Sequence, residues 1–187
     1  MDLGLIIFIL LIAVAVYAIY IYNQLVRKRQ MVEEGWSGID VQLKRRANLI
    51  PNMLEAVKGY MGHERETLDM VTKARTAVQG ATDASPAERG RLEGILSGAM
   101  GRFMAVAENY PDLKANTTFL ELQGALQTVE DEIQLSRRYY NGAVRNLNVA
   151  VESFPSNLVA NKFGFEQAEY FELENDADAA VPKISFD

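Results

Sequence analysis

The hydrophobic pattern of the chain begins with an uninterrupted apolar segment. Residues 3–22 read LGLIIFILLIAVAVYAIYIY and contain no charged side chain. A helix of ~20 residues, at ~1.5 Å per residue, spans about 30 Å, the thickness of the hydrocarbon core of a bilayer. We therefore expect a transmembrane anchor at residues 1–23. Tyrosines favour the headgroup level and basic residues follow such spans, so we assign to the membrane interface Tyr17, Tyr20, Tyr22, Arg27, Lys28 and Arg29.

A cleaved signal peptide is the alternative for this segment, because Ala13-Val14-Ala15 resembles a small-x-small cleavage site. Signal peptides have a basic N-terminal region and a shorter apolar core, and residues 1–22 have neither. Retention as an anchor is therefore favoured. The basic cluster follows the span, so the positive-inside rule places the N-terminus outside and the C-terminal domain in the cytoplasm.

After the anchor, apolar residues recur at steps of three and four, the spacing of one helix face. No segment shows the alternation of a strand, so we predict an all-α fold. The longest stripe lies within residues 112–154 and continues for about six heptads, like a coiled-coil seam, with one polar member. Its members are Phe119, Leu122, Leu126, Val129, Ile133, Ser136, Tyr140, Val144, Leu147, Val151 and Phe154.

The helical pattern is interrupted at three places. Ser85-Pro86 opens a helix, with Ser85 as its cap, and Tyr110-Pro111 ends one helix and starts the next. Pro51 either separates two helices or kinks one. If it separates them, the helices are about 24–49, 52–79, 86–108 and 112–154, which predicts an antiparallel four-helix bundle over residues 24–163. If it only kinks, the anchor continues as one very long helix.

The C-terminal residues form an acidic tail. The chain of 187 residues carries 19 Lys and Arg against 25 Asp and Glu, a formal net charge of −6. Residues 164–187 hold seven of the acids and one base, which also sums to −6. We expect the beginning of this tail to pack on the bundle and ENDADAAVPKISFD to be disordered. The candidate interaction residues are the aromatics Phe163, Phe165, Tyr170 and Phe171.

The side-chain inventory leaves little catalytic chemistry. Cysteine is absent and histidine occurs once, at His63. The HExxH zinc pattern needs a second histidine where the chain has Thr67, and a bundle di-iron site needs two Glu-x-x-His elements. We therefore predict no catalytic residue, no metal, no cofactor and no small-molecule substrate. The net negative charge also argues against a nucleic-acid partner.

A short basic run, Lys44-Arg45-Arg46, lies about twenty residues beyond the anchor. It suits either anionic headgroups or a solvated helix face with local salt bridges. Consecutive residues point in different directions on a helix, and an upright helix holds the run about 30 Å from the membrane. The solvated face is therefore the favoured interpretation.

Several groups of residues form distinctive motifs. They are GWSGIDVQLKRRANLIPNMLEAVKGYMGHE at residues 35–64, ENYPDLKAN at 108–116, Tyr140-Asn141 with Arg145 and Asn148, and FPSN at 154–157. Together these motifs resemble the LemA family. The resemblance implies a bacterial single-pass membrane protein with a soluble antiparallel four-helix bundle and no established enzymatic activity. It also implies loose links to envelope homeostasis, to membrane metalloprotease neighbours and, in one branch, to magnetosome formation.

The sequence therefore favours a non-enzymatic inner-membrane protein that self-associates and serves as an envelope scaffold or membrane organiser. Its expected partners are the lipid bilayer, further copies of the chain and other membrane proteins. The alternative is an adaptor or regulator of a membrane protease or of an envelope stress response, with the acidic tail as its recognition element. A bundle enzyme or metal carrier is disfavoured by the residue inventory.

Overall fold

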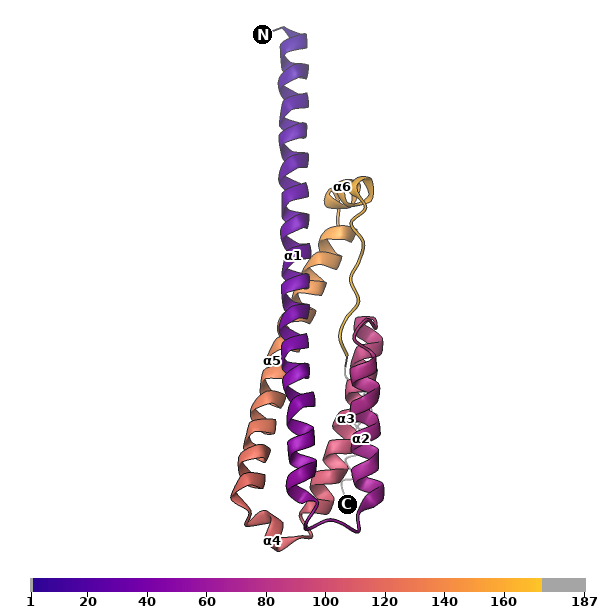
Figure 1. The fold of residues 1–187 in the computed structure, drawn as a ribbon. Coiled ribbons are helices and arrows are strands. Elements are labelled where there is room, and N and C mark those ends of the chain that lie inside the picture. The colour runs from indigo at the N-terminus through magenta and orange to yellow at the C-terminus, as the bar shows by residue number, and fades with distance from the viewer. Residues whose placement is uncertain (1, 173–187) are drawn as a thin grey trace, which may run out of the picture. The chain divides into compact units, whose positions relative to one another are not determined.

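The computed structural model describes residues 2–172, and all regular structure in that range is helical (Figure 1). The all-α prediction is confirmed. The tail beyond residue 172, where the sequence predicts disorder, lies outside the described residues. The helices are α1 (Leu3–Val57), α2 (Arg65–Gly80), α3 (Pro86–Ala107), α4 (Pro111–Lys114), α5 (Thr117–Glu152) and α6 (Ser156–Phe163).

The chain divides into two compact units. Unit 1 comprises Met1–Ile39 and Ser136–Glu169, and unit 2 comprises Asp40–Leu135 and Tyr170–Asp187, of which residues 170–172 are described in the last segment. The helices α1 and α5 contribute residues to both. Each unit thus pairs segments that lie far apart in the chain. The boundaries at residues 23 and 163 that the sequence suggests stay a prediction.

Pro51 lies inside α1 and does not turn the chain. A proline within a helix removes the hydrogen bond to the carbonyl four residues earlier, here that of Ala47. The Arg75 side chain on α2 supplies the missing donor, since its Nε donates to the Ala47 carbonyl at 2.9 Å. The separated helices 24–49 and 52–79 are therefore not found, and α1 continues to Val57. The connection to α2 follows at residues 58–64.

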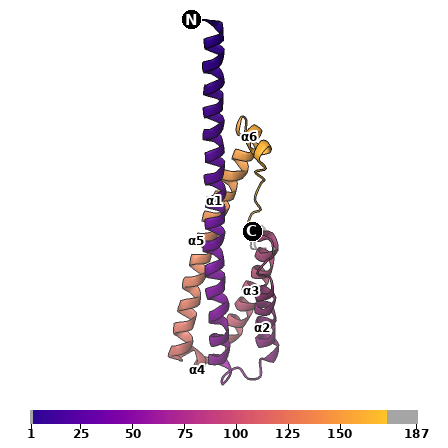
Figure 2. The same ribbon diagram turned by 45° about the horizontal axis from the view of Figure 1, so that its top comes forward.

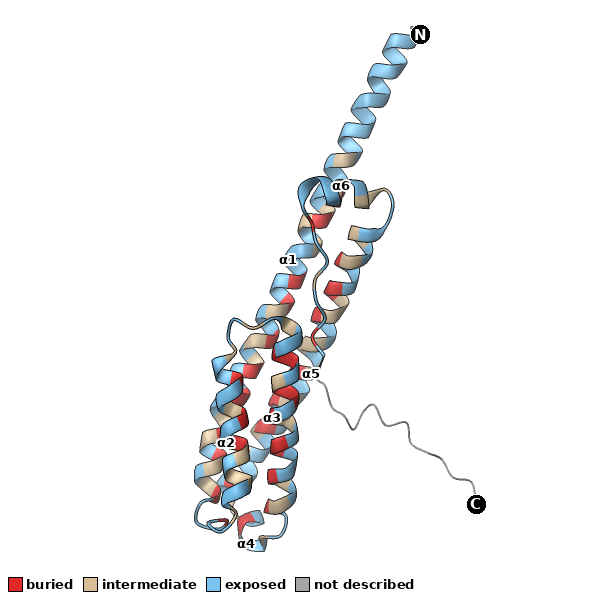
Figure 3. Cartoon of the chain, turned by 90° about the vertical axis from the view of Figure 1, so that its right-hand side faces the viewer, coloured by how far each residue is buried: buried red, intermediate tan, exposed pale blue. Residues whose placement is uncertain are grey.

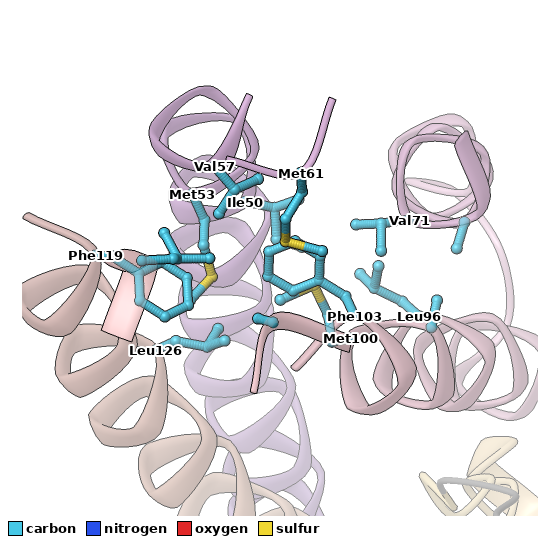
Figure 4. Close-up of a cluster of buried hydrophobic side chains, with 14 of the residues drawn as sticks. Ile50, Met53, Val57, Met61, Val71, Leu96, Met100, Phe103, Phe119 and Leu126 are labelled. Carbon is cyan, nitrogen blue, oxygen red and sulfur yellow. The ribbon is translucent and has the colours of Figure 1, made fainter. Parts of the chain in front are cut away.

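Unit 2 has one hydrophobic core to which four long helices contribute (Figure 4). Helices α2 and α3 pack against each other, and α1 and α5 add side chains to the same cluster. Phe103 from α3 is fully buried among them. Its neighbours in the cluster include Ile50, Met53 and Val57 of α1, Val71, Ala74 and Val78 of α2, Leu96 and Met100 of α3, and Phe119 and Leu126 of α5.

The first turn of α3 forms as the sequence predicts. Ser85 is the N-cap and its hydroxyl accepts from the backbone N–H of Glu88 at 3.4 Å, with Pro86 at the first helical position. The Glu88 carboxylate bonds Arg91 through two hydrogen bonds of 2.7 and 2.9 Å. That ion pair lowers the pKa of the Glu88 carboxyl below its usual value. The serine cap thus fixes where the helix begins.

Unit 1 pairs the first part of α1 with the second part of α5. The α5 stripe is buried as far as Leu147 except at Leu122 and Ser136, which are half-buried. Phe154 at its end is 80% exposed because α5 ends at Glu152 and α6 follows. The helices approach closely at Gly35. A Cβ built on Gly35 would lie 3.1 Å from both Tyr139 Cδ1 and Tyr140 Cα. A hydrogen at this position lets the two backbones approach.

Gly35→Ala is expected to destabilise the protein by about 1–2 kcal/mol, because the added methyl group overpacks this contact. Gly38→Ala is the matched control on the same helix, since a Cβ there meets nothing within 4 Å. It is expected to be neutral or to stabilise by up to about 1 kcal/mol through helix propensity. Urea unfolding of both full-length variants in non-ionic detergent measures the difference, and equal stability would contradict the close approach.

Candidate membrane interface and buried ion-pair network

The N-terminal part of α1 exposes a continuous apolar surface within unit 1 (Figure 3). Every large hydrophobic side chain from Leu3 to Tyr20 is 44–73% exposed. Within residues 2–172, α1 is the one helix that is long and apolar enough to cross a membrane. Only 6% of its most apolar 18-residue stretch is buried. The first buried residue is Ile21, at 8% exposure. The protein therefore starts to cover α1 where the apolar segment ends.

The three interface tyrosines differ in their surroundings. Tyr17 and Tyr20 are exposed, and the Tyr20 hydroxyl accepts from the Gln24 amide at 3.1 Å. Tyr22 makes edge-to-face contacts with Phe163 at 4.9 Å and Phe165 at 5.6 Å between ring centroids. Tyr22 therefore joins the end of the apolar segment to the region of α6.

The basic residues that follow the apolar segment lie on α1 in unit 1. Arg27 and Arg29 are exposed and Lys28 is half-buried. The Arg29 guanidinium lies 5.3 Å from the centroid of the Phe165 ring, a cation–π distance, and 3.8 Å from Glu33. Two of the three charges thus remain on the surface, and the third is half-covered.

The four candidate aromatic residues have different degrees of burial. Phe165 and Phe171 are buried, at 7% and 0% exposure, each within its own unit. Phe163 and Tyr170 are 60% and 40% exposed. Phe163 and Tyr170 are therefore the two of these side chains that stay exposed, and an interaction through them stays a prediction.

An extended segment after α6 is held against α5 in unit 1. Asn148 makes a two-way amide pair with Ala168, donating to its carbonyl at 2.9 Å and accepting from its N–H at 2.8 Å. Tyr140 donates its hydroxyl proton to the Glu169 carbonyl at 2.8 Å. These bonds from side chains two turns apart on α5 fix the register of the segment.

Four charged side chains form a network in unit 2, in which Arg46, Arg89 and Glu93 are buried and Glu130 is 30% exposed. Arg46 of α1 and Glu93 of α3 are fully buried and paired with each other. Arg46 Nη1 also donates to Glu130 of α5 at 3.0 Å and to the Ser97 hydroxyl at 2.9 Å. Arg89 Nε donates to Glu93 at 3.2 Å, and its Nη1 donates to the Ala81 carbonyl at 3.1 Å. Two cations balance two anions, so the network carries no net charge.

Comparisons with known proteins identify the family of the chain. The model of the LemA family matches residues 35–186, most of the chain. The chain belongs to the LemA family. It is 29% identical over 160 residues to Protein LemA of Metamycoplasma hominis, covering 83% of this chain and 72% of that one. It is 28% identical over 184 residues to Magnetosome protein MamQ 2 of Paramagnetospirillum magneticum, covering 86% and 68%.

A further relative, Magnetosome protein MamQ of Magnetospirillum gryphiswaldense, is 25% identical over 184 residues. The aligned region covers 86% of this chain and 68% of that relative. Neither the LemA family description nor these names denotes a catalytic activity. The family resemblance of the sequence motifs is confirmed, and so is membership of a family without an indicated catalytic class.

The buried network lies entirely within the LemA match, and sequence reasoning missed it. The interpretation of residues 44–46 as a solvated face holds for Lys44 and Arg45, which are exposed, and is wrong for Arg46, which is fully buried. The sequence did contain an indication that Arg46 is buried. Arg46 stands three residues after Leu43 and four before Ile50, on the apolar stripe of α1.

His63 lies exposed in the connection between α1 and α2. Within residues 2–172 there is no group of three or more metal-binding side chains placed to hold an ion. The charged side chains that the fold brings together in unit 2 include the ion pairs of Arg46 with Glu93 and Glu130 and of Arg89 with Glu93.

The pKa values of tyrosines on α5 respond to the fold. Burial raises the pKa of Tyr140 to about 12 from an ordinary value of 10.0, and the nearby Glu169 carboxylate adds to the rise. Burial and Glu34, which accepts its hydroxyl proton at 3.3 Å, also raise the pKa of Tyr139. In both cases the neutral phenol is the form that the fold favours.

Alkaline pH is expected to destabilise unit 1 through Tyr140. Its folded pKa lies above its unfolded value, so its contribution is complete below pH 10.0 and is lost as the pH rises through about 12. Tyr140→Phe is expected to cost about 1 kcal/mol at neutral pH, because the Glu169 carbonyl loses its donor. It is also expected to reduce the loss of stability that accompanies a rise to alkaline pH. Urea unfolding at several pH values measures this, and an unchanged decline would contradict it.

Proposed function

We propose that this LemA-family chain is a non-enzymatic, single-pass protein of the bacterial inner membrane that self-associates and organises other proteins or a region of that membrane. The exposed apolar surface of α1 carries the proposal. Leaving a large apolar side chain in water instead of burying it costs ~1.5–3 kcal/mol. A continuous run of such side chains that is as long as a bilayer is thick has lipid as its natural surrounding.

Within this proposal, the N-terminus is outside, and unit 2 and the part of unit 1 that follows the anchor are cytoplasmic. The basic residues at positions 27–29 support this orientation through the positive-inside rule. The core shared by α1, α2, α3 and α5 supports an antiparallel four-helix bundle in unit 2, the architecture expected for the soluble part.

Self-association is supported by apolar side chains that the chain itself leaves uncovered. In unit 1, Met31 on α1 is 42% exposed, and Tyr139 and Val149 on α5 are 46% and 55% exposed. The internal seam of α5 does not provide this surface, because Tyr140, Val144 and Leu147 are buried within the chain. The outward faces of α1 and α5 are therefore the proposed contacts between copies.

The anchor is tested by fractionating cells that express the full-length chain. Protein that stays in the membrane pellet after an alkaline carbonate wash, with an intact mass that includes residues 3–22, supports the anchor. A soluble product shortened near Ala15 would show a cleaved signal peptide instead. Because the chain has no cysteine, Leu120→Cys gives a single labelling site. Its protection from an impermeant thiol reagent in intact spheroplasts supports a cytoplasmic location.

Native mass measurement of the detergent-extracted full-length chain tests self-association. A defined oligomer that falls apart when Tyr139 and Val149 are replaced by lysine supports it. A monomer at all concentrations would refute the self-association part and leave the anchor standing.

A further inference from the structure

The region of α6 exposes large apolar side chains with little charge among them. Phe154 is 80% exposed, Leu158 is 61% exposed and Phe163 is 60% exposed. Between residues 153 and 165 the only charged side chain is that of Lys162, which is itself exposed. Leu158 lies on the side of α6 away from the fully buried Ala160. The outer surface of α6 therefore carries exposed apolar side chains, the amide of Asn161 and one basic group.

Unit 1 fixes this surface at the end of the apolar segment of α1, and α6 lies beside α1 in two views (Figures 1 and 2). Ala160 and Phe165 pack in one cluster with Ile21 and Leu25. The four-residue interval between Ile21 and Leu25 is about 6 Å along a helix axis. That is close to the thickness of the headgroup layer beyond the ~30 Å hydrocarbon core. A bilayer around residues 3–20 thus has its polar boundary at the level of α6.

We propose that α6, together with Phe154, is a second membrane contact that lies in the headgroup layer beside the anchor. The inference rests on the proposed anchor and adds to it an interfacial element with a lipid surface as partner. Phe154, Leu158 and Phe163 enter the boundary between headgroups and acyl chains, as the apolar faces of interfacial helices do. Lys162 and the exposed Arg27 bind anionic lipid phosphates at the same level.

The consequence of this second contact is a fixed orientation of unit 1. A single transmembrane helix can tilt and rotate, and its orientation is set by packing and by interfacial anchors. The rings of Tyr22 and Phe163, 4.9 Å apart, couple α6 to α1. Contact of α6 with lipid therefore fixes the tilt and rotation of α1, and with them the sides of α1 that remain for other proteins.

Single-cysteine variants of the full-length chain test the proposal, because the natural chain contains no cysteine. Leu158→Cys and Phe154→Cys carry a nitroxide label on the α6 surface, and Leu11→Cys carries it in the anchor. Leu120→Cys on α5 is the matched control, a leucine of unit 2 that is 49% exposed. The proteins are reconstituted in vesicles of three parts phosphatidylcholine to one part phosphatidylglycerol. The measured quantity is the ratio of label collisions with oxygen, which enters lipid, to collisions with a water-soluble nickel chelate.

The proposal predicts a ratio at residues 154 and 158 that is several-fold higher than at residue 120 and lower than at residue 11. Ratios at residues 154 and 158 equal to that at residue 120, with residue 11 in lipid, overturn the α6 contact and leave the anchor intact. A low ratio at residue 11 overturns the anchor itself. A third outcome is that the labels at residues 154 and 158 are shielded from both oxygen and the nickel chelate. If their spectra also show spin–spin broadening that disappears when the labelled protein is diluted with unlabelled protein, a second copy of the chain covers α6. That outcome also overturns the proposal.

Discussion

Replacing Arg46 with methionine is expected to lower the free energy of unfolding by about 3–5 kcal/mol, the cost of breaking a buried ion pair from one side. Arg46 is fully buried and connects α1 to Glu93 and Ser97 of α3 and to Glu130 of α5. Without it the Glu93 carboxylate, also fully buried, keeps only Arg89 as a charged partner. A loss of this size is a large part of the stability of an ordinary domain, which is ~5–15 kcal/mol.

Urea unfolding of the full-length variants in non-ionic detergent, followed by far-ultraviolet circular dichroism, measures the loss. Arg45→Met is the matched control, because Arg45 is exposed and donates a 3.0 Å hydrogen bond to Gln42 on the same helix. Its expected effect is within about 0.5 kcal/mol. If the variants at positions 45 and 46 unfold at the same urea concentration, the network does not contribute as described.

The double variant Arg46→Met with Glu93→Gln separates the ion pair from simple loss of packing. It removes one buried cation and one buried anion, so no full negative charge is left at position 93. Its loss is expected to be smaller than the sum of the two single losses, with a coupling of ~0.5–3 kcal/mol. Additive losses would indicate that Arg46 and Glu93 stabilise the protein independently.

Local sequence rules predicted the features of this fold that depend on neighbours in the chain. The apolar segment at residues 3–22, the serine cap at Ser85 and the stripe of α5 all follow from spacing along one helix. The structure has α3 starting after Ser85 and buries most of the stripe up to Leu147. Phe154 departs from the stripe because Ser156 starts a new helix two residues later.

Features that depend on distant partners could not be read from the sequence. Pro51 is accommodated within α1 because Arg75, on a different helix, donates to the Ala47 carbonyl. Burial of Arg46 requires Glu93 and Glu130, which are far away in the chain. A rule that applies to four or five successive residues cannot contain such contacts, although the place of Arg46 on an apolar stripe was a usable warning.

The same limit applies to the candidate interaction surface. Phe163, Phe165, Tyr170 and Phe171 look alike in the sequence, as aromatics at the beginning of an acidic tail. Phe165 packs with Ile21 and Leu25, some 140 residues earlier in the chain, and is buried. Sequence spacing gave no information on this pairing, so it could not distinguish the aromatics that pack from those that remain exposed.

Replacing Phe171 with alanine is expected to cost about 3–5 kcal/mol, because truncation of a buried phenylalanine removes its contacts and leaves a cavity. Phe171 is fully buried in unit 2 and belongs to the last part of the chain that the structure describes. The Glu172 backbone lies beside Gly90 of α3, so we expect burial of Phe171 to hold residues 170–172 in this place. Urea unfolding measures the loss, and hydrogen exchange at the amides of these residues is expected to quicken in the variant.

Gly90 on α3 provides an independent test of the same docking. A Cβ built on Gly90 would lie 2.1 Å from the Glu172 carbonyl oxygen, so alanine there must displace that backbone. Gly90→Ala is therefore expected to release Phe171 and to add little to the loss in the double variant with Phe171→Ala. Gly98→Ala on the same helix is the control, because a Cβ there meets nothing within 4 Å. If Gly90→Ala leaves the free energy of unfolding and the hydrogen exchange of residues 170–172 unchanged, these residues do not lie on α3. The reason for expecting a large loss from Phe171→Ala would then be removed.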